Sequence, residues 1–236
     1  MPADLTGRVA LVTGANRGIG LRVAQGLAER GATILLGARD PQRGEEVAAG
    51  LRAQGHAAVE ALAIDVADRA SIAAAVARVE TRHGRLDVLV NNAGILTYDD
   101  PLAPDPDTVE LLFRTNTLGP WLLAAAAVPL MRFNGWGRIV NVSTEMASFA
   151  GMGTSGPSYR VSKVGLNAIT RTMAGELAGS GILVNACSPG WVRTEMGGPE
   201  APRDIEQGAA SLLWGVDLPD DGPTGLYFQD GKPLPW

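Results

Sequence analysis

The chain has 236 residues, enough to bury a sizeable core, and we expect a single domain over residues 1–236. Its 46% hydrophobic and 19% charged residues exclude a disordered chain, and its net charge of −5 gives no reason to expect nucleic acid or an anionic membrane as partner. Cys187 is the sole cysteine and the amino terminus lacks a basic segment followed by an apolar stretch. We therefore expect a cytoplasmic protein with no disulfide and no cysteine-based zinc cluster.

Strands and helices should alternate through the first half of the chain. Val9–Val12 is an apolar run without alternation, typical of a strand buried on both faces of a parallel sheet. A glycine-rich turn and a helix closing at Gly31 come next. The cycle continues with a strand over 33–37, a helix over 42–54, a strand over 58–64, a helix capped by Ser71 and reaching Arg82, and a strand over 86–90.

The second half begins with a long apolar helical pattern over 108–133, which we expect to be bent or interrupted near Gly119-Pro120 and Pro129. The remaining predictions are strands over 138–143, 182–186 and 226–228, a helix from Ser158 to about Gly179, and a helix near Asp204. This rhythm predicts an α/β fold: a Rossmann-type, doubly wound parallel sheet of about seven strands, flanked by helices in three α/β/α layers.

The first turn carries three glycines in the pattern Gly14-x-x-x-Gly18-x-Gly20, between a strand and a helix. Glycines allow a tight turn and a close backbone approach, so a pyrophosphate can sit on amides at the positive end of the helix. The spacing departs from the commonest dinucleotide fingerprint, and an ordinary glycine turn would show the same residues. The pattern therefore indicates a dinucleotide site without proving one.

The end of the second strand favours NADP over NAD. An acidic residue there would bind the adenosine ribose of NAD, but Ala38 holds that place and Arg39 follows it. With Arg17 from the glycine loop, two guanidinium groups could clamp a 2′-phosphate. The alternative is that both arginines are solvated surface charges, and Asp40, adjacent to Arg39, stands against the clamp.

Tyr159 and Lys163 lie four positions apart at the start of a predicted helix. This spacing puts the phenol and the ammonium on one helical face, one turn apart. A nearby cation favours the phenolate, so such a tyrosine can exchange a proton at working pH. A half-buried aromatic beside a solvated lysine would give the same pair.

Taken in order, these motifs resemble those of the short-chain dehydrogenase/reductase superfamily over essentially the whole chain, most closely its carbonyl reductase branch. They are Thr13-Gly14-x-x-x-Gly18-Ile19-Gly20, Asn91-Asn92-Ala93-Gly94, Asn116, Asn141-Val142-Ser143-Thr144, Tyr159-x-x-x-Lys163 and Pro189-Gly190.

The resemblance implies a reduction in which Tyr159 donates a proton to a carbonyl oxygen. Lys163 would lower the tyrosine pKa and hold the nicotinamide ribose, and Asn116 would anchor a water linking the lysine to solvent. The hydroxyl that polarises the carbonyl is usually the second of two adjacent serines, a place held here by Thr144 after Ser143. Thr144 lies 15 residues before Tyr159, slightly more than is common, so we expect a small insertion between them. We assign the role to Thr144, with Ser143 in reserve.

The resemblance also implies a set of cofactor contacts. Thr194 and the Val192 backbone would hold the carboxamide, Asn92 would hold the neighbouring ribose region, and Asp65 with Val66 would meet the adenine. The full set expected to contact NADPH or NADP is Gly14, Asn16, Arg17, Gly18, Ile19, Gly20, Arg39, Asp65, Val66, Asn92, Ala93, Gly94, Tyr159, Lys163, Pro189, Gly190, Val192 and Thr194.

The substrate region offers fewer signals. Met146, Phe149 and Met152 are expected as apolar walls, and the short interval between Gly190 and the helix near Asp204 predicts an open site for bulky ketones. No acidic cluster accompanies the two histidines, so no metal is expected.

The function expected is NADPH-dependent reduction of a ketone or aldehyde, reversible as a secondary-alcohol dehydrogenase, in a homodimer or homotetramer. Two alternatives remain: a ketoreductase acting on a carrier-bound thioester, and a catalytically silent NADP-binding protein on the same fold.

Overall fold

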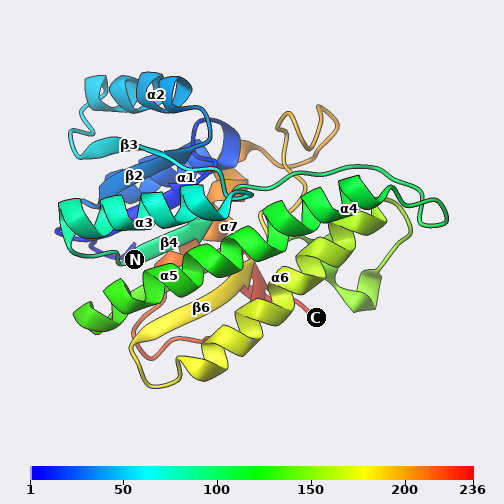
Figure 1. Cartoon of the computed structure of the whole chain (residues 1–236). Coiled ribbons are helices and arrows are strands. Elements are labelled where there is room, and N and C mark those ends of the chain that lie inside the picture. Colours follow the sequence, from blue (N-terminus) through cyan, green and yellow to red (C-terminus); the bar gives the residue numbers. More distant parts are fainter. Residues whose placement is uncertain (1) are drawn as a thin grey trace.

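The computed structural model describes residues 2–236 and contains an eight-stranded sheet in the order β3-β2-β1-β4-β5-β6-β7-β8 (Figure 1). The strands are β1 (Val9–Thr13), β2 (Thr33–Ala38), β3 (Val59–Ala63), β4 (Val88–Asn91), β5 (Gly137–Val142), β6 (Ile182–Cys187), β7 (Tyr227–Gln229) and β8 (Lys232–Pro233). The α-helices are α1 (Gly18–Ala28), α2 (Pro41–Ala53), α3 (Arg69–His83), α4 (Pro106–Phe113), α5 (Gly119–Asn134), α6 (Pro157–Glu176) and α7 (Ile205–Val216). Strands β1 to β7 are parallel, and only β7 and β8 pair antiparallel within the described chain.

Helices cover both faces of the sheet, so the core is divided into two. Successive residues of a strand point to opposite faces, and β1 shows this directly. Ala10 and Val12 pack with residues of α1, α2 and α7, whereas Val9 and Leu11 pack with residues of α3, α5 and α6. The predicted doubly wound fold in three layers is thus confirmed.

The strand count differs from the predicted number of about seven. The additional strand, β8, is two residues long, and it turns back along β7 through a segment containing Asp230 and Gly231 with positive φ. Two residues are too few to show the alternation on which strand prediction depends. The hairpin is therefore invisible in the sequence pattern.

The start of α3 also differs from the prediction, because Asp68 and not Ser71 caps this helix. The Asp68 carboxylate accepts a hydrogen bond from the Ala70 N–H at 2.9 Å. Ser71 lies inside the first turn, and its Oγ accepts from the N–H of Asp65 at 2.9 Å. Both side chains can cap a helix, so composition alone did not separate them.

The long apolar pattern over 108–133 forms two α-helices joined by a π-helical segment, η1 (Arg114–Leu118), directly before Gly119. Pro129, expected as a second possible break, lies inside α5, which continues through it. Such π turns are rare and occur often at functional sites. Asn116 lies within this one.

The order of the sheet reverses between β1 and β4, and ligands of open α/β sheets bind outside the carboxyl ends of strands at such a point. The glycine loop follows β1, residues 92–94 follow β4, Thr144 follows β5 at its second position and Pro189 follows β6. The predicted site residues are therefore gathered at one edge of the sheet. Within residues 2–236, no helix combines the length and the apolar character needed to cross a membrane.

Candidate active site

Tyr159 and Lys163 lie on the first turns of α6 and are both buried, at 8% and 4% exposure. Burial raises the pKa of Tyr159 to about 12, the Thr144 hydroxyl opposes this rise, and the Tyr98 phenol adds to it. Burial also lowers the pKa of Lys163 to about 8. The phenol is thus held protonated at neutral pH.

The lysine ammonium is held by the backbone of the neighbouring strand. Its Nζ donates to the Val142 carbonyl at 2.7 Å and lies 6.0 Å from the centre of the Tyr159 ring. A Cβ placed on Gly94 would stand 3.4 Å from the same Nζ, so the chain after β4 approaches the lysine closely. In the protein alone, burial dominates the pKa of Tyr159, and the lowering expected from Lys163 stays a prediction.

The two adjacent hydroxyls after β5 face different partners. Ser143 is buried, and its Oγ donates to Asn167 Oδ1 of α6 at 2.7 Å. Thr144 is half-buried, accepts from the Met146 N–H at 3.3 Å, and lies near enough to Tyr159 to lower the pKa of its phenol. This arrangement favours Thr144 as the hydroxyl that meets a carbonyl oxygen.

Asn116 is fully buried in the π turn, and both the oxygen and the nitrogen of its side-chain amide form hydrogen bonds. Its Oδ1 accepts from the Ile95 N–H at 2.9 Å, and its Nδ2 donates to the Ile95 carbonyl at 2.8 Å and to Ser162 Oγ at 3.0 Å. The asparagine therefore fixes the chain after β4 against α6. The water expected at Asn116 stays a prediction.

The glycine loop forms a narrow cradle at the amino end of α1. Gly14 and Gly18 have positive φ values of 62° and 55°, which L side chains rarely adopt. A Cβ on Gly20 would stand 2.4 Å from Asn92 Nδ2, and that amide donates to the Thr13 and Gly14 carbonyls at 2.9 and 3.2 Å. Backbone amides at a helix amino terminus bind phosphate groups. The cradle thus fits the pyrophosphate of a dinucleotide.

Further predicted contacts lie on loops at the same edge. Asp65 Oδ1 accepts from the Ala67 N–H at 2.9 Å, and Val66 packs in the core. Thr194 Oγ1 accepts from the Gly197 N–H at 3.1 Å, and its methyl carbon would stand 3.7 Å from a Cβ on Gly18. The loop after β6 therefore closes against the glycine cradle.

The two arginines assigned to the 2′-phosphate have different surroundings. Arg17 forms an exposed ion pair with Glu195, on the loop that faces the cradle. Arg39 is exposed and has no ion pair with any residue that the structure describes. Asp40 caps α2 by accepting from the Gln42 and Arg43 N–H groups at 2.9 and 3.2 Å. The carboxylate next to Arg39 thus caps α2, and it forms no ion pair with Arg39.

Sequence reasoning missed several residues that support these groups. Asn167 stands two turns after Tyr159 and one turn after Lys163, so extending the same four-residue spacing by one step would have found it. Ser162, the partner of Asn116, is adjacent to Lys163 and carried no separate signal. Tyr98 lies on a loop without periodicity, and only the fold brings it near Tyr159.

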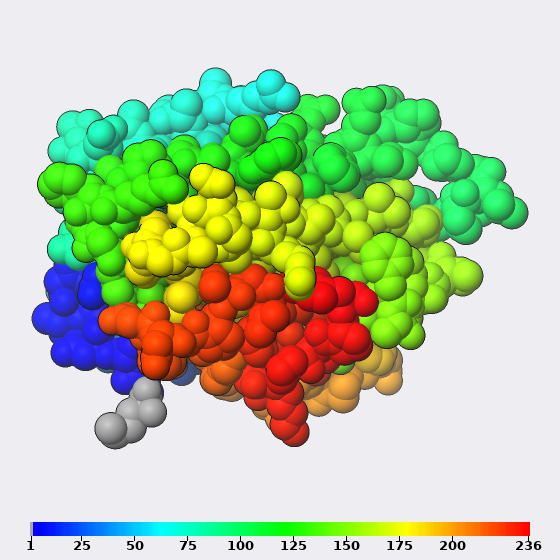
Figure 2. All heavy atoms as spheres, turned by 90° about the horizontal axis from the view of Figure 1, so that it is seen from below, coloured from blue at the N-terminus to red at the C-terminus, as the bar shows by residue number. Residues whose placement is uncertain are grey.

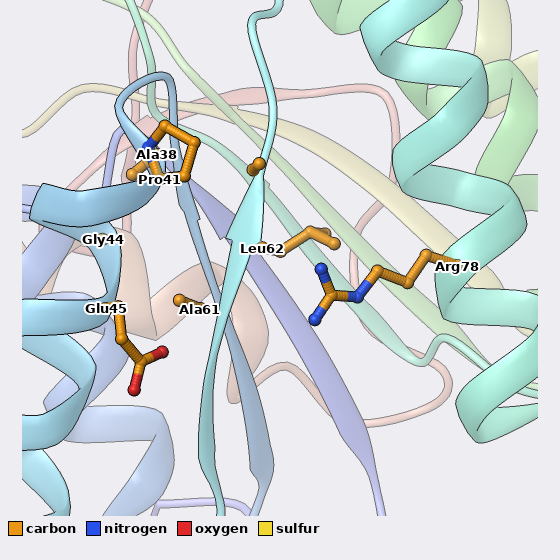
Figure 3. Close-up of a pocket in the computed structure, with 8 residues that line it drawn as sticks. Ala38, Pro41, Gly44, Glu45, Ala61, Leu62 and Arg78 are labelled. Atoms are coloured by element: carbon orange, nitrogen blue, oxygen red, sulfur yellow. The ribbon is translucent and has the colours of Figure 1, made fainter.

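A cavity of about 170 Å³ lies where α2, β2, β3 and α3 meet (Figure 3). Small apolar side chains, the exposed carboxylate of Glu45 and the guanidinium of Arg78 surround it. None of the predicted site residues lines it. Nor does the described chain, residues 2–236, gather three His, Cys, Asp or Glu side chains that could hold a metal ion.

Residues 8–204 match the sequence profile of the family described as short chain dehydrogenase. The chain belongs to this family, which confirms the resemblance stated from its motifs.

Individual relatives place it near the carbonyl reductases. It is 34% identical to carbonyl reductase (NADPH) 1 of Sus scrofa over 97% of this chain and 94% of that protein. The structure of NADPH-bound carbonyl reductase from chicken fatty liver is similar with a TM-score of 0.88 and 30% identity, over 98% of this chain and 99% of that one. A gluconate 5-dehydrogenase from Burkholderia cenocepacia J2315, in complex with NADP and tartrate, gives a TM-score of 0.85 and 30% identity over 96% and 95% of the two chains.

Proposed function

We propose that the protein is an NADPH-dependent oxidoreductase that reduces a ketone or aldehyde to an alcohol and runs in reverse as a secondary-alcohol dehydrogenase. Membership of the family supports an oxidoreductase. Relatives named as NADPH carbonyl reductases, together with neighbours solved with NADPH or NADP, support the cofactor and the carbonyl.

The residues present suit the cofactor. The amides of the cradle would hold the pyrophosphate, Arg39 the 2′-phosphate, and Lys163 the nicotinamide ribose. Arg17 would leave its exposed partner Glu195 for the phosphate, because exposed ion pairs contribute little stability. When bound, NADPH supplies the hydride that reaches the carbonyl carbon.

The side chains of this protein would handle the proton. Tyr159, with a pKa of about 12, is protonated at neutral pH and can donate its proton to the carbonyl oxygen as negative charge develops there. Thr144 would donate a second hydrogen bond to that oxygen. When an alcohol is oxidised, Tyr159 takes the proton back, and Lys163, whose pKa is about 8, can stabilise the phenolate in its charged form.

The observation that carries the proposal is the buried Tyr159 phenol, with Thr144 beside it and Lys163 on the next helical turn. The test is the initial rate of absorbance loss of NADPH, and separately of NADH, against aryl ketones, diketones, quinones and cyclic ketones. We expect turnover that prefers NADPH and that falls by about a thousandfold or more in Tyr159→Phe, which lacks the donated proton.

Two outcomes would contradict the proposal in different ways. Equal rates with NADPH and NADH would refute binding of the 2′-phosphate by Arg17 and Arg39, but would still support the reduction of a carbonyl. Tight NADPH binding without oxidation by any carbonyl would instead favour the silent NADP-binding protein.

A further inference from the structure

Arg160, the residue directly after Tyr159, is a buried arginine without an acidic partner. It is 9% exposed, and no carboxylate of residues 2–236 pairs with it. Its Nε donates to the Ser155 carbonyl at 2.7 Å, and its Nη1 donates to the Met146 carbonyl at 3.0 Å. A guanidinium offers five donors in a fixed plane, so it can hold two carbonyls in one geometry.

The two carbonyls belong to opposite ends of one loop, residues 145–156, which we call the cleft loop. It follows Thr144 and returns to α6 just before Tyr159, and so connects the two hydroxyls of the site. Two 3-10 turns form its first part, and it lies at the amino end of α6 (Figure 1). Arg160 therefore ties the start of this loop to its end, within the segment where the sequence indicates an insertion.

The cleft loop presents apolar side chains outward. Phe149 is 69% exposed and Met152 is 39% exposed, whereas Ala147 and Ser148 at its base are buried. A space-filling view from below shows the carboxyl-terminal segment on the surface beside α6 (Figure 2). The exposed aromatic and thioether groups of this loop, which leads from Thr144 to the helix of Tyr159, suit the apolar part of a bulky substrate.

Arg160 is also linked to Thr144 through a single residue, Met146. Met146 accepts from Arg160 with its carbonyl, and its N–H donates to Thr144 Oγ1 at 3.3 Å. The bond to Thr144 is the longer of the two, and the preceding Ser143 is held to β6 by the bond from its N–H to the Cys187 carbonyl at 2.9 Å. A shift of the loop should therefore move its apolar side chains more than it moves Thr144.

We propose that Arg160 is a positioning residue that holds the cleft loop as one wall of the substrate site and so determines acceptance of bulky ketones. The inference rests on the proposed carbonyl reduction. The substrate class it specifies is ketones with a large apolar group beyond the carbonyl, because a small ketone meets only the hydroxyls of Thr144 and Tyr159.

The contact between Arg160 and the cleft loop can also be perturbed by a substitution in the loop itself. A Cβ on Gly153 would stand 3.1 Å from Arg160 Nη2, so Gly153→Ala should shift the guanidinium by a few tenths of an ångström and strain its two bonds to the loop. Gly151 lies in the same loop with open space around it, so Gly151→Ala is the matched control. Arg160→Met removes the donors, and Arg160→Lys keeps the charge but loses the planar fork.

Steady-state kinetics should be measured with a bulky aryl ketone and with a small aliphatic ketone. We expect Arg160→Met to raise KM for the bulky ketone about tenfold with a small change in kcat, and to leave KM for the small ketone and for NADPH near the wild-type values. Arg160→Lys should fall between. Gly153→Ala should raise the same KM in the wild-type background and have no further effect in Arg160→Met, because both act through one contact.

Uniform losses with both ketones and with NADPH would overturn the inference, as would additive effects of the two substitutions. Amide hydrogen exchange gives a readout that needs no turnover: residues 145–156 should exchange faster in Arg160→Met while the strands keep their protection. If the wild-type protein reduces neither ketone, the proposed function fails, yet the exchange experiment still tests the role of Arg160. Unchanged exchange in the loop would refute that role.

Discussion

Lys163 places an ammonium group in the interior. Burying this charge lowers the free energy of unfolding, and the size of the loss should be measurable from the pH dependence of stability. Burial lowers the pKa of Lys163 from 10.5 to about 8, whereas in the unfolded chain the group keeps its ordinary value. Between these two values the unfolded state binds more protons than the folded state, so stability rises with pH. Below the folded pKa the full penalty is present, and above the unfolded pKa it disappears.

The size of the effect follows from the shift. A change from 10.5 to about 8 corresponds to a penalty of roughly 3 kcal/mol at neutral pH. Raising the pH from about 6.5 to about 9.5 should recover roughly 2 kcal/mol of it. Other groups also titrate in this range, among them the Tyr159 phenol of the unfolded chain at its upper end, so the contribution of the lysine must be isolated by a difference.

Lys163→Met provides that difference, because it keeps an apolar stem of similar length and removes the titrating group. Urea unfolding of both proteins across the pH range gives the free energy of unfolding of each. The wild type should gain roughly 2 kcal/mol relative to the variant as the pH rises. Loss of the bond from Nζ to the Val142 carbonyl adds a constant offset only. A difference that does not depend on pH would refute the assignment of a buried, titrating lysine.

Three other predictions follow from the site. Thr144→Ala should lower kcat roughly a hundredfold, whereas Ser143→Ala, which loses the bond to Asn167, should cost about 1 kcal/mol of stability; the opposite ranking would reverse their roles. Burial raises the pKa of the Cys187 thiol to about 12, so a thiol reagent should modify it only after denaturation, as mass spectrometry can show. Arg39→Ala should raise KM for NADPH about tenfold and leave KM for NADH unchanged; parallel increases would contradict a 2′-phosphate contact.

Local spacing made the main parts of the site predictable. The glycines at 14, 18 and 20 and the pair Tyr159 and Lys163 are defined by positions along one turn or one helix, so their geometry follows from residue separation. The apolar runs of the parallel strands were predictable for the same reason, since strands buried on both faces leave a clear composition signal. These signals placed the candidate site residues at the carboxyl ends of the strands.

Contacts between distant segments were not predictable in this way. Ser143 and Thr144 are adjacent and chemically alike, and only the packing of α6 shows that the first bonds to Asn167 while the second lies near Tyr159. From the sequence alone, Arg160 would be assigned to the exposed face of its helix. Its partners are backbone carbonyls, which every residue carries, so no particular residue type indicates the contact. Hydrogen bonds from a side chain to a backbone carbonyl therefore cannot be predicted from the residue types in the sequence.

The π turn over Arg114–Leu118 limits how the length of this chain can change. A π turn holds more residues than an α turn. Deleting one residue there would let α4 and α5 join as one α-helix with nearly unchanged orientation, because five residues of a π turn rotate the chain about as far as four residues of an α-helix. The bulge that brings Asn116 to the Ile95 backbone would then be lost, whereas α5 would keep its buried face toward the sheet. A deletion in this segment would therefore be tolerated by the fold but not by the site.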